Sequence, residues 1–95
     1  MTFEHISSTA NDTVKLLKSL ERKKARNESG LFLAEGARLA EEALNNGWIP
    51  TYALAGIGAL ERPQTNDLLA RMKKAGARVL TASEKVLASV SRRFR

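Results

Sequence analysis

The alternation of short apolar runs with segments of helical periodicity constrains the fold of this chain most strongly. Strand-like runs at 31–34, 49–55 and 78–80 are separated by stretches in which apolar residues recur every three to four positions. Strands that alternate with helices run in one direction and carry helices on both faces of their sheet. We therefore expect an α/β fold, a three-layer α/β/α sandwich with a small, mainly parallel sheet.

Short polar residues and glycines mark the expected ends of the helices. Residues 11–13, Asn-Asp-Thr, are a good helix start because their side chains can accept from free backbone N–H groups. If this helix runs on, Arg26 extends its basic stripe, and residues 27–30 are expected to form a turn. Gly47 then ends the second helix. The expected order is helix, strand, helix, strand, helix, strand, helix. Gly76 is expected to end the third helix. A Thr-x-x-Glu capping box at 81–84 is expected to open the last helix.

Positive charge is the second strong feature. The formal net charge is +6 and the isoelectric point is about 10.2, which on 95 residues indicates a polyanionic partner, nucleic acid first. Four cations lie within residues 22–26, and Lys15 and Lys18 extend them upstream at helical spacing. Convergent Arg and Lys side chains suit phosphates. The alternative is a solvated helix end whose cations complement the helix dipole.

Several kinds of site are excluded by residue content. There is no cysteine, hence no disulfide, thiolate nucleophile or Cys-based zinc site. His5 is the only histidine, and a metal needs several ligands, so no metal is expected. Gly56-Ile57-Gly58 opens an expected loop at 56–62, but the third glycine of a dinucleotide-binding turn is replaced by Glu61.

The chain has no sequence feature of a secreted or membrane protein. Residues 1–5 carry an acid and no apolar run, unlike a signal or transit peptide. No stretch approaches the roughly 20 apolar residues of a membrane span. We expect a soluble, cytoplasmic protein without a membrane partner.

Two other features have both a structural and a functional interpretation. Trp48 lies beside a helix stop and Tyr52 within a strand, so packing is expected rather than stacking on bases, and no aromatic platform is present. Glu35 follows an expected strand, where open α/β sheets place ligands. Its carboxylate can instead accept from N–H groups of the next turn, and both possibilities stay open.

The run RKKARNESGLFLAEG at 22–36 resembles the signature that opens the SpoU/TrmH-type RNA 2′-O-ribose methyltransferases. The shared pattern is a basic helix end, a polar turn, Gly-x-Phe, two small or apolar residues and Glu-Gly. Residues 6–8 and 14–17 also match, and the second half matches only as a pattern of strands and helices. Asp12 stands where family members often have Pro. The motif positions are Gly30, Phe32, Glu35 and Gly36.

The resemblance implies the N-terminal RNA substrate-binding domain, over residues 1–95, with a fold like that of certain ribosomal RNA-binding proteins. A knotted catalytic domain is expected after residue 95, where the basic end at 91–95 looks like a cut. That domain would hold S-adenosylmethionine and the catalytic residues and would mediate homodimerisation. This chain alone is expected to be monomeric, with no catalytic residue and no cofactor.

By the same resemblance the cations bind rRNA or tRNA. Lys23, Lys24 and Arg26 are expected on phosphates, and Phe32 and Leu33 in the scaffold. The full expected RNA-binding set is Lys15, Lys18, Arg22, Lys23, Lys24, Arg26 and Arg38. Two alternatives remain: a stand-alone ribosomal-type RNA-binding protein without catalysis, and a protein-interaction module whose charge only maintains solubility.

Overall fold

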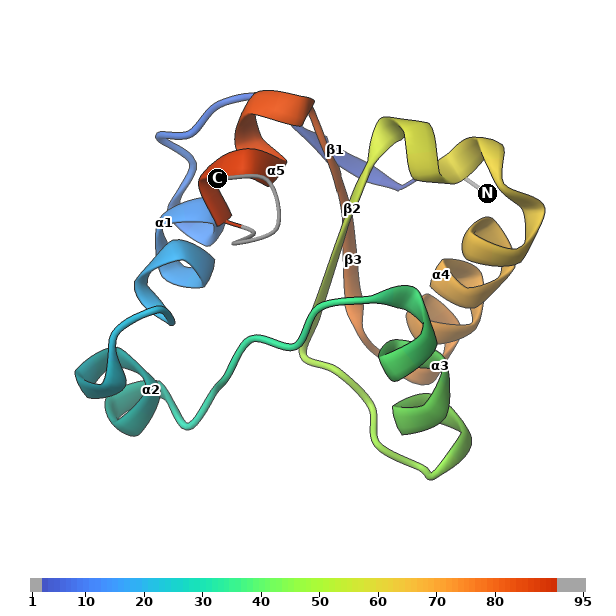
Figure 1. Cartoon of the computed structure of the whole chain (residues 1–95), viewed down its shortest axis with the longest axis horizontal. Helices are drawn as coiled ribbons and strands as arrows, with labels where there is room; N and C mark the ends of the chain where they lie inside the picture. The colour runs from blue at the N-terminus through green and yellow to red at the C-terminus, as the bar shows by residue number, and fades with distance from the viewer. Residues whose placement is uncertain (1–2, 91–95) are drawn as a thin grey trace.

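The computed structural model describes residues 3–90 of the chain (Figure 1). Within this range the strands are β1 (Glu4–Ile6), β2 (Tyr52–Gly56) and β3 (Arg78–Ala82). The α-helices are α1 (Asp12–Ser19), α2 (Lys23–Ser29), α3 (Ala37–Asn45), α4 (Pro63–Ala75) and α5 (Glu84–Val90), and a short 3-10 helix, η1, spans Ile57–Glu61. None of the described helices is long and apolar enough to cross a membrane.

The three strands form one parallel sheet in the order β1–β3–β2. Leu80 in β3 lies opposite Glu4 of β1 and Leu54 of β2, so the last strand in sequence is the central one. The parallel arrangement confirms the expected α/β class.

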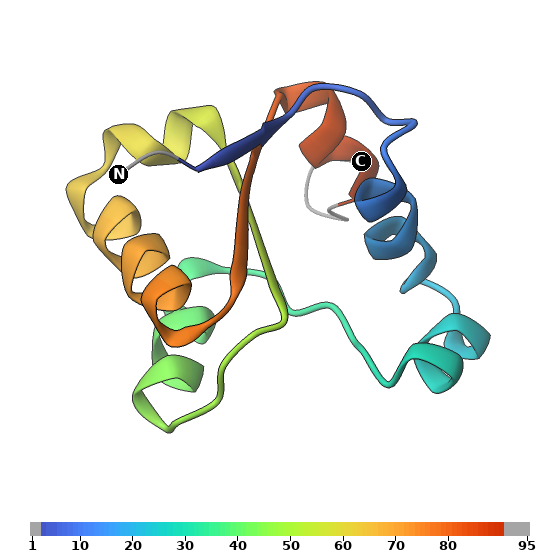
Figure 2. The same ribbon diagram turned by 180° about the vertical axis from the view of Figure 1, so that it is seen from behind.

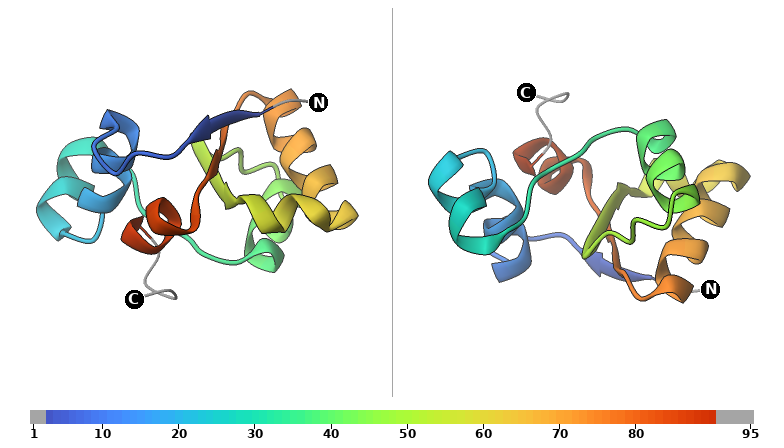
Figure 3. Two further views of the ribbon diagram at one scale, coloured as in Figure 1. Left: turned by 90° about the horizontal axis from the view of Figure 1, so that it is seen from above. Right: turned by 90° about the horizontal axis from the view of Figure 1, so that it is seen from below.

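Helices cover both faces of the sheet (Figures 1 and 2). One face packs on α1 and α5, and the other on α4, with α3 outside it. Seen from above and below, the two helical layers lie on opposite sides of the strands (Figure 3). The three-layer sandwich is therefore confirmed. The first core contains Ile6, Val14, Leu17, Leu20, Leu80, Ala82, Val86 and Val90. The second contains Phe3, Leu68, Leu69, Met72, Ala77 and Val79.

Strand β3 is covered on both faces. Side chains alternate along a strand, so Leu80, with no exposed surface, enters the α1–α5 core, while Val79 enters the α4 core. Thr81 is buried as well, and its Oγ1 shares a hydrogen bond of 2.9 Å with His5 Nδ1. The hydroxyl is thereby satisfied inside the sheet.

Helix α1 begins where the sequence predicts. The Asn11 side chain accepts from Thr13 N at 2.8 Å and Val14 N at 3.4 Å, which confirms the expected cap. Val14 and Leu17 then bury against the sheet. The helix does not run on to residue 26, however; it ends at Ser19, and Arg22 is extended, with φ −93° and ψ 135°.

The expected turn at 27–30 is wrong, because α2 continues to Ser29. Gly30 then ends the helix in the left-handed region, with φ 72°, and its N–H donates to Arg26 O at 2.9 Å. Helix α3 follows and runs to Asn45, close to its expected end at Gly47.

The strand predicted at 31–34 is also wrong. These residues form no strand, and the third strand of the sheet is β1, which the sequence analysis did not expect. Only Leu31 of the run packs against the first core, whereas Phe32 is 68% exposed. A continuous apolar run predicts a strand when both faces are covered, and no element covers both faces here. The expected scaffold packing of Phe32 is not observed.

Smaller differences concern the second strand. Strand β2 begins at Tyr52 rather than 49, and Trp48, expected to pack, is 68% exposed. The expected loop at 56–62 contains η1. Helices α4 and α5 lie close to where they were expected, and β3 runs on to Ala82. The predicted capping box at 81–84 is wrong, because Thr81 belongs to β3 and it is Ser83 Oγ that accepts from Val86 N, at 3.3 Å. The basic end at 91–95 lies outside the described residues.

An ion pair joins the start of β3 to β1. Arg78 Nη2 donates to Glu4 Oε1 at 2.9 Å, and Nη1 donates to Thr13 Oγ1 of α1 at 3.1 Å. These hydrogen bonds to Glu4, and its negative charge, raise the pKa of Arg78 above its ordinary value. Arg78 thus links β3 both to Glu4 of the short strand β1 and to Thr13 of α1.

Arg26 joins α2 to the end of α1. Its Nη1 donates to Leu20 O at 3.0 Å and to Glu21 O at 2.9 Å. The last carbonyls of a helix lack partners within it, so a cation that binds beyond the last turn satisfies them and complements the dipole. The orientation of α2 relative to α1 depends on this guanidinium.

Replacing Arg26 with Ala should lower the free energy of unfolding by about 1–2 kcal/mol, because two charge-assisted hydrogen bonds are lost. Urea denaturation measures this change. Arg22→Ala, which removes an exposed cation without such bonds, is the matched control and should have little effect. Equal stability of both variants would contradict the role of Arg26.

Gly30→Ala should destabilise the fold by about 1 kcal/mol, because a side chain strains the left-handed conformation. An added Cβ meets no atom within 4 Å there, so conformational strain is the only cost. Gly58→Ala, at an equally open position without positive φ, should be near neutral in the same urea experiment. Equal losses would mean that backbone conformation is not the cause.

Candidate RNA-binding surface

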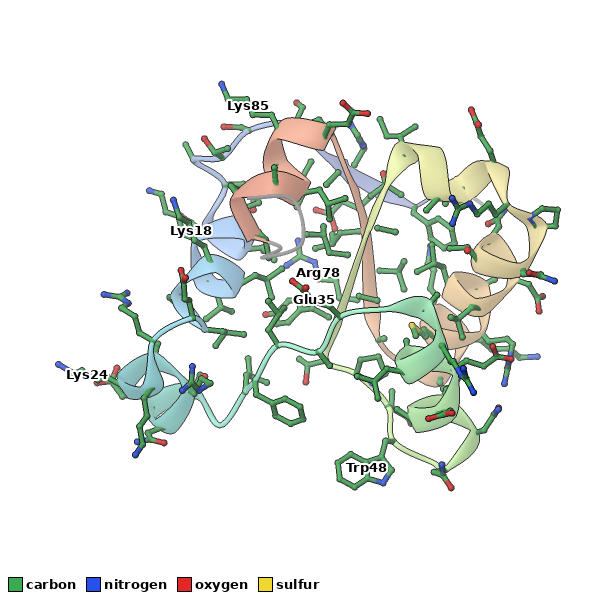
Figure 4. The ribbon with its side chains drawn as sticks, in the orientation of Figure 1. Lys18, Lys24, Glu35, Trp48, Arg78 and Lys85 are labelled. Atoms are coloured by element: carbon green, nitrogen blue, oxygen red, sulfur yellow. The ribbon has the colours of Figure 1, made fainter. Side chains whose placement is uncertain are left out.

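The cations predicted from the sequence gather on α1, α2 and the break between them. Residues 15–26 hold six Lys and Arg against one acid, Glu21. Lys18 and Lys24 point outward from their helices in Figure 4. Val14 and Leu17 hold the opposite side of α1 on the sheet, and this orientation directs the cations to solvent. We call the five outward cations the α1–α2 surface: Lys15, Lys18, Arg22, Lys23 and Lys24.

An open hollow lies at the end of α1. It is lined by Lys15, Lys18, Ser19, Glu21 and Arg22. Three predicted cations therefore meet around one depression, although the continuous helical stripe expected from their spacing is wrong, because the helix breaks before Arg22. The break directs the chain around the hollow, so Arg22 lines it from an extended segment.

Glu28, the acid of α2, neutralises little of the charge of this surface. Lys24 Nζ lies 4.0 Å from Glu28 Oε1, and both side chains are mostly exposed. Exposed pairs of this kind contribute on the order of 0–1 kcal/mol. Within residues 3–90, the ion pairs involve none of Lys15, Lys18, Arg22 and Lys23. These four keep their donors available for an anion.

Arg26 and Arg38 differ from the rest of the predicted set. Arg26 is half-buried and commits Nη1 to the carbonyls of Leu20 and Glu21, just after α1, which leaves its other N–H groups for any phosphate. Arg38 is 94% exposed and lies 3.8 Å from Glu42, but α3 belongs to the opposite helical layer. The fold does not bring Arg38 onto the α1–α2 surface.

The remaining motif residues connect α2 to α3. Glu35 is half-buried, and in Figure 4 its side chain lies toward the middle of the molecule, away from Lys18 and Lys24. Gly36 precedes α3 with φ 110°, a conformation that favours glycine. Because no strand precedes Glu35, the strand-end argument for a ligand there no longer applies.

The described residues suit contact with an extended anion better than enclosure of a small molecule. A second hollow, between α3 and α4, is open and mixed in charge, with Glu41, Gln64, Asp67, Leu68 and Arg71 around it. Small-molecule sites are usually concave and mostly apolar, and neither hollow is of that kind. In the described part of the chain, no three His, Asp or Glu residues are grouped to hold a metal ion.

Some exposed residues were not included in the predicted site. Lys85 of α5 is exposed in the same helical layer as α1 (Figure 4). Phe32 and Trp48 expose their rings, although both were expected to pack. For Trp48 a signal existed, since it lies between Gly47 and Pro50, beyond the expected end of a helix and at the edge of the expected strand.

Two solved structures share this architecture. One is an rRNA methyltransferase from Sinorhizobium meliloti, with a TM-score of 0.80 and 30% sequence identity. The match covers 97% of this chain and 33% of the methyltransferase chain. The other is the AdoMet-bound rRNA methyltransferase from the same organism, with a TM-score of 0.79 and 31% identity over 95% of this chain and 32% of its own. This chain thus spans about one third of each. No curated protein matches it.

The model of the MRM3-like substrate binding domain matches residues 11–95, which include the α1–α2 surface. Together with the two methyltransferase structures, this match confirms the resemblance found in the sequence. The chain belongs to the MRM3-like substrate binding domain family.

Proposed function

We propose that this chain is the RNA-binding domain of an S-adenosylmethionine-dependent RNA 2′-O-ribose methyltransferase that acts on rRNA or tRNA. The observation that carries the proposal is the α1–α2 surface, a cluster of exposed cations on a substrate-binding domain. Its structural relatives are named as rRNA methyltransferases, one with AdoMet bound.

The domain would position RNA by binding the phosphates of the RNA backbone. Lys15, Lys18 and Arg22 surround a hollow that can receive a phosphate, and Arg offers two parallel donors where Lys offers a point charge. Lys23 and Lys24 would take neighbouring phosphates along α2. Such contacts fix the register of a nucleic acid without reading its sequence.

Catalysis would take place outside these residues. We place S-adenosylmethionine, and the groups that activate the ribose hydroxyl, in a further domain of the full protein, since this chain spans about one third of its methyltransferase relatives, one of which binds AdoMet. That domain would also mediate homodimerisation. When this domain already holds the RNA in place, less entropy is lost in bringing the ribose hydroxyl up to the methyl donor.

Changing Lys23 and Lys24 together to Glu should weaken RNA binding about ten- to a hundredfold at low salt, because two phosphate contacts become repulsive. Arg26 is kept, since its loss would also disturb the fold. Fluorescence anisotropy of a labelled RNA measures the affinity.

The matched control is Arg62→Glu with Lys74→Glu, which makes the same change in net charge on the α4 layer. This variant should lose much less affinity. If both double variants weaken binding equally, net charge rather than the α1–α2 surface determines binding.

A further inference from the structure

Five apolar side chains are exposed on two connecting segments and on the helix between them. Phe32 and Leu33 lie on the segment between α2 and α3, Leu39 on α3, and Trp48 and Ile49 on the connection to β2. Both connecting segments face the viewer when the molecule is seen from below (Figure 3). We call these five residues the apolar face.

The two aromatic rings distinguish this face from ordinary exposed surface. The chain has only five aromatic residues, and Phe32 and Trp48 are each 68% exposed. Burying an aromatic side chain contributes strongly to a core, yet the core here consists mainly of Leu, Val and Ala. Exposed apolar groups that cluster mark a binding surface more often than isolated ones do.

Two residues of the apolar face adjoin cations in the sequence, one of which, Arg38, also lies with its Nε 3.8 Å from Glu42 Oε1. Phe32 comes two residues after Gly30, the end of α2, so the ring directly follows the helix that carries Lys23 and Lys24. Arg38 precedes Leu39 and extends 94% of its side chain into solvent. Rings flanked by cations match the combination that binds unpaired nucleotides, in which cations hold the backbone and aromatic faces stack on bases.

We propose that Phe32 and Trp48 stack on unpaired bases of RNA whose phosphates lie on the α1–α2 surface. This inference rests on the proposed function and narrows its substrate to RNA with single-stranded nucleotides. Another protein could also bind the apolar face. The neighbouring cations favour RNA instead, because RNA is a polyanion whose bases are aromatic rings.

Trp48 is the only tryptophan, so its fluorescence reports on the apolar face alone. Titration of the 95-residue chain with a short oligoadenylate should quench this fluorescence as the indole stacks. A blunt-ended RNA duplex, which has no unpaired base, should bind the cations with little quenching. Binding of oligoadenylate, measured by anisotropy, without any change in Trp48 emission would overturn the inference.

Variants make the test independent of the spectrum. Phe32→Ala and Trp48→Ala should each lower affinity for oligoadenylate roughly five- to a hundredfold, with binding of the duplex unchanged. Trp48→Phe, which keeps an aromatic ring, should retain most of the wild-type affinity for oligoadenylate. Ile57→Ala, which trims an apolar side chain exposed to a similar degree on η1, is the control. Urea denaturation checks that each variant is folded.

The outcomes separate this inference from the proposed function. If the wild-type chain binds no RNA, both the proposed function and the stacking inference are contradicted. Salt-sensitive binding that Phe32→Ala and Trp48→Ala leave intact would contradict stacking alone. Concentration-dependent self-association, abolished by Trp48→Ala, would assign the apolar face to a protein contact and overturn the inference.

Discussion

The burial of β3 on both faces is the constraint on which the rest of the structure depends. Leu80 and Ala82 have no exposed surface on one side, and Val79 is buried on the other. Because β3 pairs with both remaining strands, it fixes the register of the sheet and anchors both helical layers. The position of α1 follows, since Val14 and Leu17 pack on the same core as Leu80. The cations of α1 can then only face outward.

The break between α1 and α2 determines how the cations of residues 15–26 are arranged in space. A continuous helix would distribute the cations along one straight stripe. Instead, the chain bends at Arg22, and Arg26 reaches back to the carbonyls of Leu20 and Glu21. One cation thus serves the fold, and its neighbours remain available to a ligand. This division explains why charge density alone does not identify which cations bind RNA.

Local patterns predicted most of the framework. The Asn11 cap, the glycines that end helices and the alternation of elements gave the α/β/α sandwich correctly. Strand β1 was missed because Glu4 and His5 are polar, and their partners Arg78 and Thr81 lie more than seventy residues away. The apolar run at 31–34 was assigned to a strand in error, because apolar character cannot say whether a neighbour covers both faces.

The candidate site was predicted as a set of residues but not as an arrangement. Spacing placed Lys15, Lys18 and Arg22 together, and they do line one hollow. Spacing could not reveal the helix break that shapes this hollow, or that Arg38 belongs to the opposite layer. The exposure of Phe32 and Trp48 likewise depends on contacts that form only in the folded chain.

The most direct test of the α1–α2 surface is a map of backbone amide chemical shifts by NMR, recorded while the isotope-labelled chain is titrated with RNA. The account predicts that large shifts fall within residues 15–26 and beside Phe32 and Trp48, with the amides of α4 nearly unchanged. Shifts concentrated on α4 and η1, or shifts absent from α1 and α2 at saturating RNA, would contradict it.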